Sequence, residues 1–157
     1  MPLRMFIHGL ESNNQGTKAV YFRKNFPDML TPKFPGSLDE RMADLRALLS
    51  GESDIILVGS SFGGLMASIF VMENEPRVKR LVLLAPAINL MEFSPYRNRK
   101  IQVPVHIYHG RQDEVIPLED VQTVARQVFS DLTFHSVDDD HYLHKTFEKI
   151  DWDTLLR

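Results

Sequence analysis

Length, composition and charge set the first limits on this protein. The chain has 157 residues, which suits a single domain, and 43% of them are hydrophobic while 25% are charged. These values exclude a disordered or fibrous chain, and a formal net charge of −3 gives no indication of nucleic-acid binding. There are no cysteines, which excludes a disulfide scaffold, a thiol nucleophile and thiolate metal sites.

The sequence shows no sign of targeting or of division into parts. No segment approaches the ~20 apolar residues of a membrane span, and the apolar stretch at the N-terminus is too short for a signal-peptide core. No repeat, low-complexity tract or flexible linker interrupts the chain. We therefore expect one domain over residues 1–157, located in the cytoplasm, with no membrane insertion and no nucleic-acid partner.

Apolar runs of strand length alternate with helical patterns along the chain. The predicted strands are 3–7, a poorly defined run at 28–34, then 54–58, 78–84, 103–108 and a weaker run at 132–137. The predicted helices are 17–26, 38–49, 65–72 and 118–129, and Ser37 is the expected N-cap of the second. This alternation predicts a three-layer α/β/α sandwich around a mostly parallel sheet of about six strands. In such sheets the functional site lies at the carboxyl ends of the strands.

A Gly-x-Ser-x-Gly pattern lies between the predicted strand 54–58 and a helix. Residues 59–64 read Gly-Ser-Ser-Phe-Gly-Gly, so Gly59 and Gly63 flank Ser61 at the spacing of a nucleophile elbow. Glycines relieve crowding where the strand and helix approach each other, and the helix N-terminus favours negative charge. Ser60 does not fit, because glycines would be needed at both positions two residues away. A simple tight turn or a phosphate-binding loop is the alternative, although the Lys-Ser/Thr pair of a P-loop is missing.

A nucleophilic serine needs a histidine base and an acid, which in this type of site follow it in the order Ser, acid, His. Asp113 lies just after the strand 103–108 and is the predicted acid, with Glu114 as its neighbouring alternative. His141 follows the last predicted strand and is the predicted base, with His144 as its rival. The acidic run 138–140 and these histidines are also compatible with a solvated turn or a metal site.

An acyl-transfer site also needs backbone donors for the oxyanion. We expect these to be the N–H groups of Phe62, which follows the nucleophile, and of Leu10, in the loop after the first strand. Gly9 before Leu10 lets the backbone approach a substrate. His8 and His109 are interpreted as structural residues of the neighbouring loops.

With these motifs in order, the sequence resembles the α/β-hydrolase superfamily over nearly its whole length. More narrowly, it resembles the small, lidless bacterial YqiA-type esterases, on the compactness of the chain and the run 59–64. The resemblance implies hydrolysis of carboxylic esters or acyl-CoA-like thioesters through an acyl-enzyme, without metal or cofactor. The sequence departs from the superfamily pattern in two ways. It starts directly at the strand that leads to His8 and Gly9, so we expect a fold without the usual first antiparallel strands. Only the positions between Ala85 and Val103 are available for a lid, which is too few for a cap domain.

An open site follows from the missing cap. Its expected walls are Met91, Phe93 and Tyr96, which are equally compatible with surface packing. A basic stretch nearby, Arg97, Arg99 and Lys100, either meets a phosphate-bearing substrate or is a solvated loop. A homodimer in which a second subunit shelters the site, a non-catalytic binding module of the same fold, a serine peptidase and an unrelated nucleotide binder all stay open as alternatives.

Overall fold

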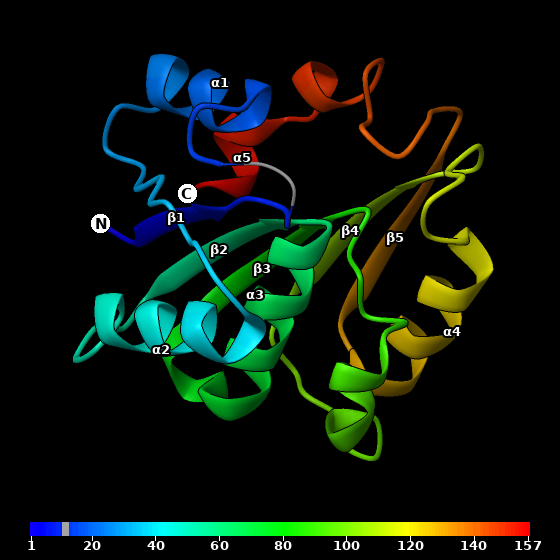
Figure 1. Cartoon of the computed structure of the whole chain (residues 1–157), viewed down its shortest axis with the longest axis horizontal. Helices are drawn as coiled ribbons and strands as arrows, with labels where there is room; N and C mark the ends of the chain where they lie inside the picture. Colours follow the sequence, from blue (N-terminus) through cyan, green and yellow to red (C-terminus); the bar gives the residue numbers. More distant parts are fainter. Residues whose placement is uncertain (11–12) are drawn as a thin grey trace.

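Five parallel strands form the centre of the molecule in the computed structural model, which describes residues 1–10 and 13–157 (Figure 1). Their order in the sheet follows their order in the chain, so each neighbouring pair is joined by a crossover connection. The strands are β1 (Leu3–Ile7), β2 (Ile55–Ser60), β3 (Val78–Leu84), β4 (Val105–Gly110) and β5 (Leu132–Val137). All carboxyl ends therefore lie along one edge of the sheet.

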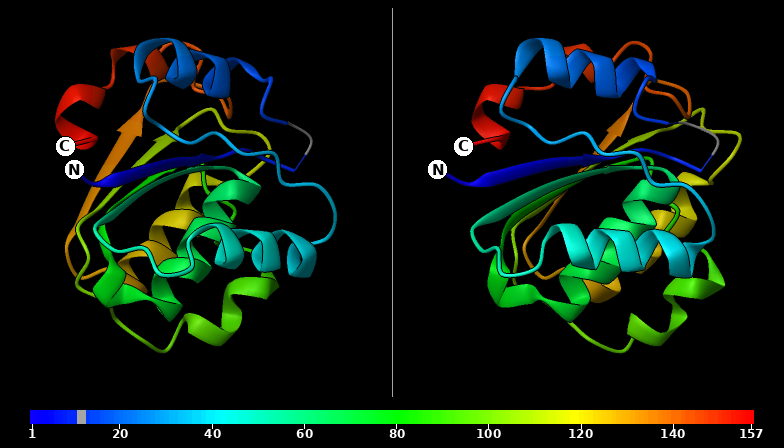
Figure 2. Two further views of the ribbon diagram at one scale, coloured as in Figure 1. Left: turned by 90° about the vertical axis from the view of Figure 1, so that its left-hand side faces the viewer. Right: turned by 60° about the vertical axis from the view of Figure 1, so that its left-hand side comes forward.

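Helices cover both faces of this sheet. The α-helices are α1 (Thr17–Asn25), α2 (Leu38–Leu48), α3 (Phe62–Glu73), α4 (Leu118–Val128) and α5 (Trp152–Leu155). Three short 3-10 helices are η1 (Glu75–Arg77), η2 (Met91–Tyr96) and η3 (Phe147–Lys149). The views in Figure 2 place α1 and α5 on one face and α2, α3 and α4 on the other. The predicted three-layer α/β/α sandwich is confirmed.

Each face of the sheet has its own hydrophobic core. Along β2, Ile55 and Leu57 pack towards α2, α3 and α4, whereas Ile56 and Val58 pack towards α1 and α5. Successive side chains of a strand point to opposite faces, so a strand buried on both sides must be apolar at every position. This accounts for the uninterrupted apolar run that marked the strand in the sequence.

The sheet has five strands where about six were predicted, because the run 28–34 does not form one. It pairs with β1 through an isolated bridge between Met5 and Leu30. Leu30 N–H donates to the Arg4 carbonyl and the Leu30 carbonyl accepts from Phe6 N–H, both at 2.9 Å. Pro32 and Pro35 follow closely, and proline has no N–H to continue a ladder of hydrogen bonds. The segment thus begins to pair with β1 and then leaves it.

Helix boundaries follow local capping chemistry. Ser37 is the N-cap of α2 as predicted, and it forms a reciprocal capping box with Glu40. The helix α3 begins at Phe62, three residues before the predicted start, because it continues directly from the turn at Ser61. Among the described residues, no helix is long and apolar enough to cross a membrane.

Candidate active site

Ser61 occupies the sharp turn between β2 and α3, at the carboxyl edge of the sheet. Its backbone has φ 54° and ψ −116°, a conformation that residues with side chains rarely adopt. The flanking glycines make this turn possible. A Cβ atom on Gly59 would lie 2.4 Å from the Gly63 carbonyl oxygen, and one on Gly63 would lie 2.1 Å from the Ile7 carbonyl oxygen. The predicted elbow geometry is therefore present, with a strained serine and two positions that admit only glycine.

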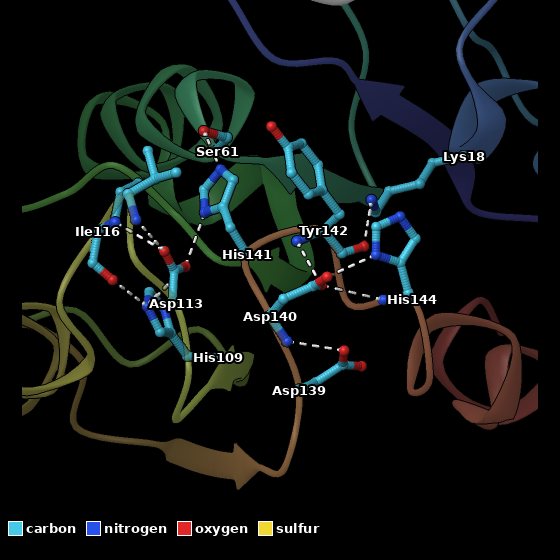
Figure 3. Close-up of polar contacts among 11 residues, drawn as sticks. Lys18, Ser61, His109, Asp113, Ile116, Asp139, Asp140, His141, Tyr142 and His144 are labelled. Carbon is cyan, nitrogen blue, oxygen red and sulfur yellow. Dashed lines mark hydrogen bonds and ion pairs between the residues drawn. The ribbon is translucent and has the colours of Figure 1, made fainter.

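A chain of hydrogen bonds connects Ser61 to a histidine and a carboxylate from two other loops (Figure 3). The Ser61 Oγ atom lies 3.2 Å from His141 Nε2, and His141 Nδ1 lies 2.7 Å from Asp113 Oδ2. The Asp113 side chain is fully buried and that of His141 is 10% exposed. Because Nδ1–H donates to the carboxylate, Nε2 is left as the acceptor that faces the serine hydroxyl.

The Asp113 carboxylate is held by more than its histidine partner. Its Oδ1 accepts hydrogen bonds from the N–H groups of Val115 and Ile116, at 2.9 and 2.8 Å. Its Oδ2 also lies 3.2 Å from Nε2 of the buried His109, which donates to the Ile116 carbonyl at 2.8 Å. Burial lowers the pKa of His109, so this imidazole is neutral near pH 7. Three hydrogen bonds thus fix the orientation of Asp113, and the His109 ring packs against its Oδ2.

The loop that carries His141 is ordered by its acidic residues. Asp139 Oδ2 accepts from the N–H groups of Lys145 and Thr146, at 2.9 and 2.8 Å. Asp140 accepts from Tyr142 N–H at 3.0 Å and pairs with Nδ1 of the alternative base, His144, at 2.6 Å. The His144 side chain is 71% exposed. The acidic run therefore shapes the turn, and its pairing leaves His141 as the histidine that contacts Ser61.

The two expected oxyanion donors belong to segments that adjoin the nucleophile. Phe62 is the first residue of α3, so its N–H has no acceptor within the helix. Leu10 follows Gly9, whose Cβ position lies 3.5 Å from the Ser61 Cβ atom. His8 holds this loop, since its Nδ1–H donates to the Gly9 carbonyl at 2.8 Å while its Nε2 accepts from Phe34 N–H at 2.9 Å. Burial lowers the pKa of His8, which keeps this arrangement neutral.

Two of the expected substrate walls lie elsewhere. Phe93 is fully buried in the core, and the Tyr96 hydroxyl donates to the Glu73 carboxylate at 3.3 Å. Glu73 is the last residue of α3, so at about 1.5 Å per residue it lies about 16 Å along the helix from Phe62. Figure 1 shows η2, which begins at the exposed Met91, beside this distant part of α3. Phe93 and Tyr96 therefore do not line the site, because the chain after β3 turns back towards the amino ends of the strands. The role of the exposed Met91 stays a prediction.

The basic residues after η2 share this location. Arg97 Nε donates to Gln127 Oε1 at 3.0 Å, near the end of α4, and Arg99 and Lys100 are exposed in the loop that leads to β4. They are therefore remote from Ser61 and form a solvated loop, the second of the two alternatives. Among the described residues, no group of three or more His, Cys, Asp or Glu side chains is placed to hold a metal ion.

Two residues near the site were missed in the sequence. The Tyr142 ring stands next to His141, with ring centroids 5.3 Å apart, and is 59% exposed (Figure 3). Arg41, on α2, contacts the loop of Leu10 and is 5% exposed. Its signal was present, because position 41 belongs to the core-facing stripe of this helix together with Met42 and Leu45. A charged residue in such a stripe requires a specific partner.

Comparison with known proteins identifies the family. The model of the dienelactone hydrolase family matches residues 12–138, which is most of the chain. The chain belongs to the dienelactone hydrolase family. The matched segment includes Ser61 and Asp113 and ends just before His141. Membership supports a hydrolytic function and confirms the predicted relation to α/β-hydrolases.

Solved structures similar to this dienelactone hydrolase family member have the same fold. The ferulic acid complex of Est1E from Butyrivibrio proteoclasticus has a TM-score of 0.80 at 18% identity, over 99% of this chain and 86% of that one. An alpha-beta serine hydrolase homologue from Coxiella burnetii has a TM-score of 0.78 at 20% identity, over 99% and 84%. Mouse alpha/beta hydrolase domain-containing protein 10 gives 0.76 at 19%, over 93% and 84%. No curated protein matches the sequence.

Proposed function

We propose that this protein is a serine hydrolase that cleaves carboxylic esters or acyl thioesters of small molecules through an acyl-enzyme intermediate. The observation that carries the proposal is the unbroken hydrogen-bond chain from Ser61 Oγ through His141 to the buried Asp113, which starts at a strained elbow. A serine hydroxyl is a weak nucleophile at neutral pH, and a chain of this kind supplies the base that activates it.

Acylation begins when the Ser61 oxygen attacks the carbonyl carbon of the substrate. His141 Nε2 takes the hydroxyl proton as the new carbon–oxygen bond forms, and Asp113 stabilises the resulting imidazolium. The tetrahedral intermediate then breaks its bond to the leaving alkoxide or thiolate, which receives the proton from His141. The alcohol or thiol departs, and the acyl group stays on Ser61 as an ester.

Deacylation repeats these steps with water as the nucleophile. His141 removes a proton from water as the oxygen attacks the acyl carbon, and it returns the proton to the Ser61 oxygen when that bond breaks. The carboxylic acid leaves and the serine is regenerated. In both halves the negative oxygen of the intermediate is proposed to accept hydrogen bonds from the Leu10 and Phe62 N–H groups, next to the positive end of α3.

The test combines labelling with turnover. Wild type and Ser61→Ala are exposed to a fluorophosphonate probe and then assayed with p-nitrophenyl esters and acyl-CoA thioesters of short and long chain. We expect labelling that disappears in Ser61→Ala, with turnover reduced by about 10⁴-fold or more. Ser60→Ala is the matched control and keeps both properties. A folded wild type that neither reacts with the probe nor cleaves any substrate refutes the proposal and favours the binding-module alternative.

A further inference from the structure

Arg41 is a cation buried next to the candidate site, in the first half of α2. Its side chain is almost completely covered, with 5% of the residue exposed, and burial lowers its pKa. Its hydrogen-bond partners are two backbone carbonyls, since Nε donates to Gly36 at 2.9 Å and Nη2 donates to Leu10 at 3.2 Å. Its Nη1 is buried and has no partner within residues 1–10 and 13–157. No carboxylate of the same residues forms an ion pair with it.

Such an environment is unfavourable for a charged side chain unless its position serves a purpose. A buried cation loses its hydration, and neutral carbonyl groups replace only part of it. The helix itself does not require this arginine, because α2 already has the Ser37 capping box at its start. The contacts that Arg41 makes with other segments therefore account for its burial.

Arg41 touches both residues whose N–H groups are expected to bind the oxyanion. One contact is the hydrogen bond to the Leu10 carbonyl, and the other places the guanidinium carbon 5.4 Å from the centre of the Phe62 ring, within the range of a cation–π interaction. Leu10 lies in the loop after β1, and Phe62 begins α3 after β2. A single side chain therefore links the two parts of the expected oxyanion site.

The Leu10 loop needs such support. The Leu10 side chain is 52% exposed, so apolar packing does little to fix this residue. The residue before it, Gly9, is held by the His8 imidazole through its carbonyl, and Arg41 provides the corresponding contact one residue further on. The Gly9 carbonyl and the Leu10 N–H belong to one peptide unit, so His8 orients that N–H on one side, and Arg41 holds the next peptide unit through the Leu10 carbonyl. Without Arg41, Leu10 would be anchored on one side only.

We propose that Arg41 is a positioning residue that fixes Leu10 and Phe62 so that their N–H groups converge on the oxyanion. This inference rests on the proposed serine-hydrolase function. The planar guanidinium suits the task, because it donates in a fixed plane to two carbonyls while its central carbon lies over the Phe62 ring. A lysine has neither the fork of donors nor the flat surface. Arg41 also places a fixed positive charge near the site where negative charge develops.

The experiment compares substitutions of Arg41 with a matched change on the same helix. Arg41→Met and Arg41→Lys are compared with the control Arg46→Met. Arg46 is exposed and pairs with Glu73 at the end of α3 that is remote from Ser61. We expect kcat for a p-nitrophenyl ester to fall about 10²-fold in Arg41→Met, as for loss of an oxyanion donor, with KM changed less than about threefold. The kcat of Arg41→Lys should fall nearly as far, and the kcat of Arg46→Met should equal that of the wild type.

Two further readouts distinguish positioning from a merely structural role. The kcat is normalised to active sites titrated with a fluorophosphonate, and guanidinium at millimolar concentration is added to Arg41→Ala. Positioning predicts a low kcat per titrated site, an unchanged midpoint of the pH–rate profile and partial recovery with guanidinium. Normal kcat per site in folded Arg41→Met overturns the inference, as does an active Arg41→Lys if the Met variant does not fold. A wild type without turnover or labelling instead refutes the proposed function itself.

Discussion

The substitution Asp113→Asn tests the electrostatic design of the site at one atom. Asp113 Oδ2 accepts from the ring N–H of His141 at 2.7 Å and lies 3.2 Å from Nε2 of His109, and Oδ1 accepts from two backbone N–H groups. An asparagine side chain has one oxygen and one NH₂ group, so the NH₂ group must face hydrogen-bond donors at either the Oδ1 or the Oδ2 position. If the NH₂ group takes the Oδ2 position, His141 has to present Nδ1 as an acceptor. The Nε2 atom of His141 then carries the proton and cannot activate Ser61.

The expected loss in kcat/KM is about 10⁴-fold, which is the effect of the wrong histidine tautomer in a well-studied triad of the same type. The opposite orientation of the amide would leave two backbone donors unpaired, which costs about 1–3 kcal/mol each, so it offers no escape. The assay is p-nitrophenyl ester hydrolysis, with thermal unfolding to verify the fold. Glu114→Gln is the control, because the neighbouring carboxylate is the competing acid in the sequence. A folded Asp113→Asn within tenfold of wild type, or an equal loss in Glu114→Gln, would refute the reasoning.

Two other consequences concern stability. A Cβ at Gly63 would lie 2.1 Å from the Ile7 carbonyl oxygen, so we expect Gly63→Ala to reduce the free energy of unfolding by roughly 1–3 kcal/mol or more. Each kcal/mol lost should lower Tm by about 2–4 °C. Gly9→Ala is the control and should keep the wild-type Tm, because the atom nearest to its Cβ position lies 3.5 Å away. The second consequence concerns the pH dependence of stability. Burial lowers the pKa of four histidines from the ordinary 6.5, namely His8, His106, His109 and His135. The unfolded state then binds more protons below pH 6.5, so the free energy of unfolding should fall with decreasing pH, by up to about 1.4 kcal/mol per unit for each histidine. Urea titrations between pH 7.5 and 5 measure this dependence of the free energy of unfolding on pH. His109→Gln should reduce the slope by the equivalent of about one proton taken up on unfolding. An unchanged slope would contradict the lowered pKa of His109.

The strands and the elbow could be predicted because each depends on local chemistry. The strands 3–7, 78–84 and 132–137 have the predicted bounds. The spacing of Gly59, Ser61 and Gly63 encodes the turn itself, since nothing larger than glycine fits at either flank. The order of the loops after β2, β4 and β5 then brought the acid and the histidine to the same edge of the sheet.

The failures have a common cause in tertiary geometry. Nothing in the pattern of Phe93 and Tyr96 indicates that the chain after β3 returns to the far end of α3, so their apolar character was interpreted as a substrate wall. The partner of a side chain in another segment is equally hidden. The link from Arg41 to Leu10 spans 31 residues, and only the misplaced charge in an apolar helix stripe hinted at it. In the same way, the run 28–34 pairs with β1 only at Leu30, because the prolines that follow interrupt the ladder of hydrogen bonds, and how far the pairing extends is seen only in the assembled sheet.

The most direct test of the account is to locate the fluorophosphonate adduct on the intact protein by mass spectrometry and peptide mapping. We predict one adduct per molecule, on Ser61, because among the residues that the structure describes only this hydroxyl is hydrogen-bonded to His141, which is itself hydrogen-bonded to Asp113. An adduct on Ser60 or on another serine, or a folded protein that forms none, would contradict the assignment of Ser61 as the nucleophile.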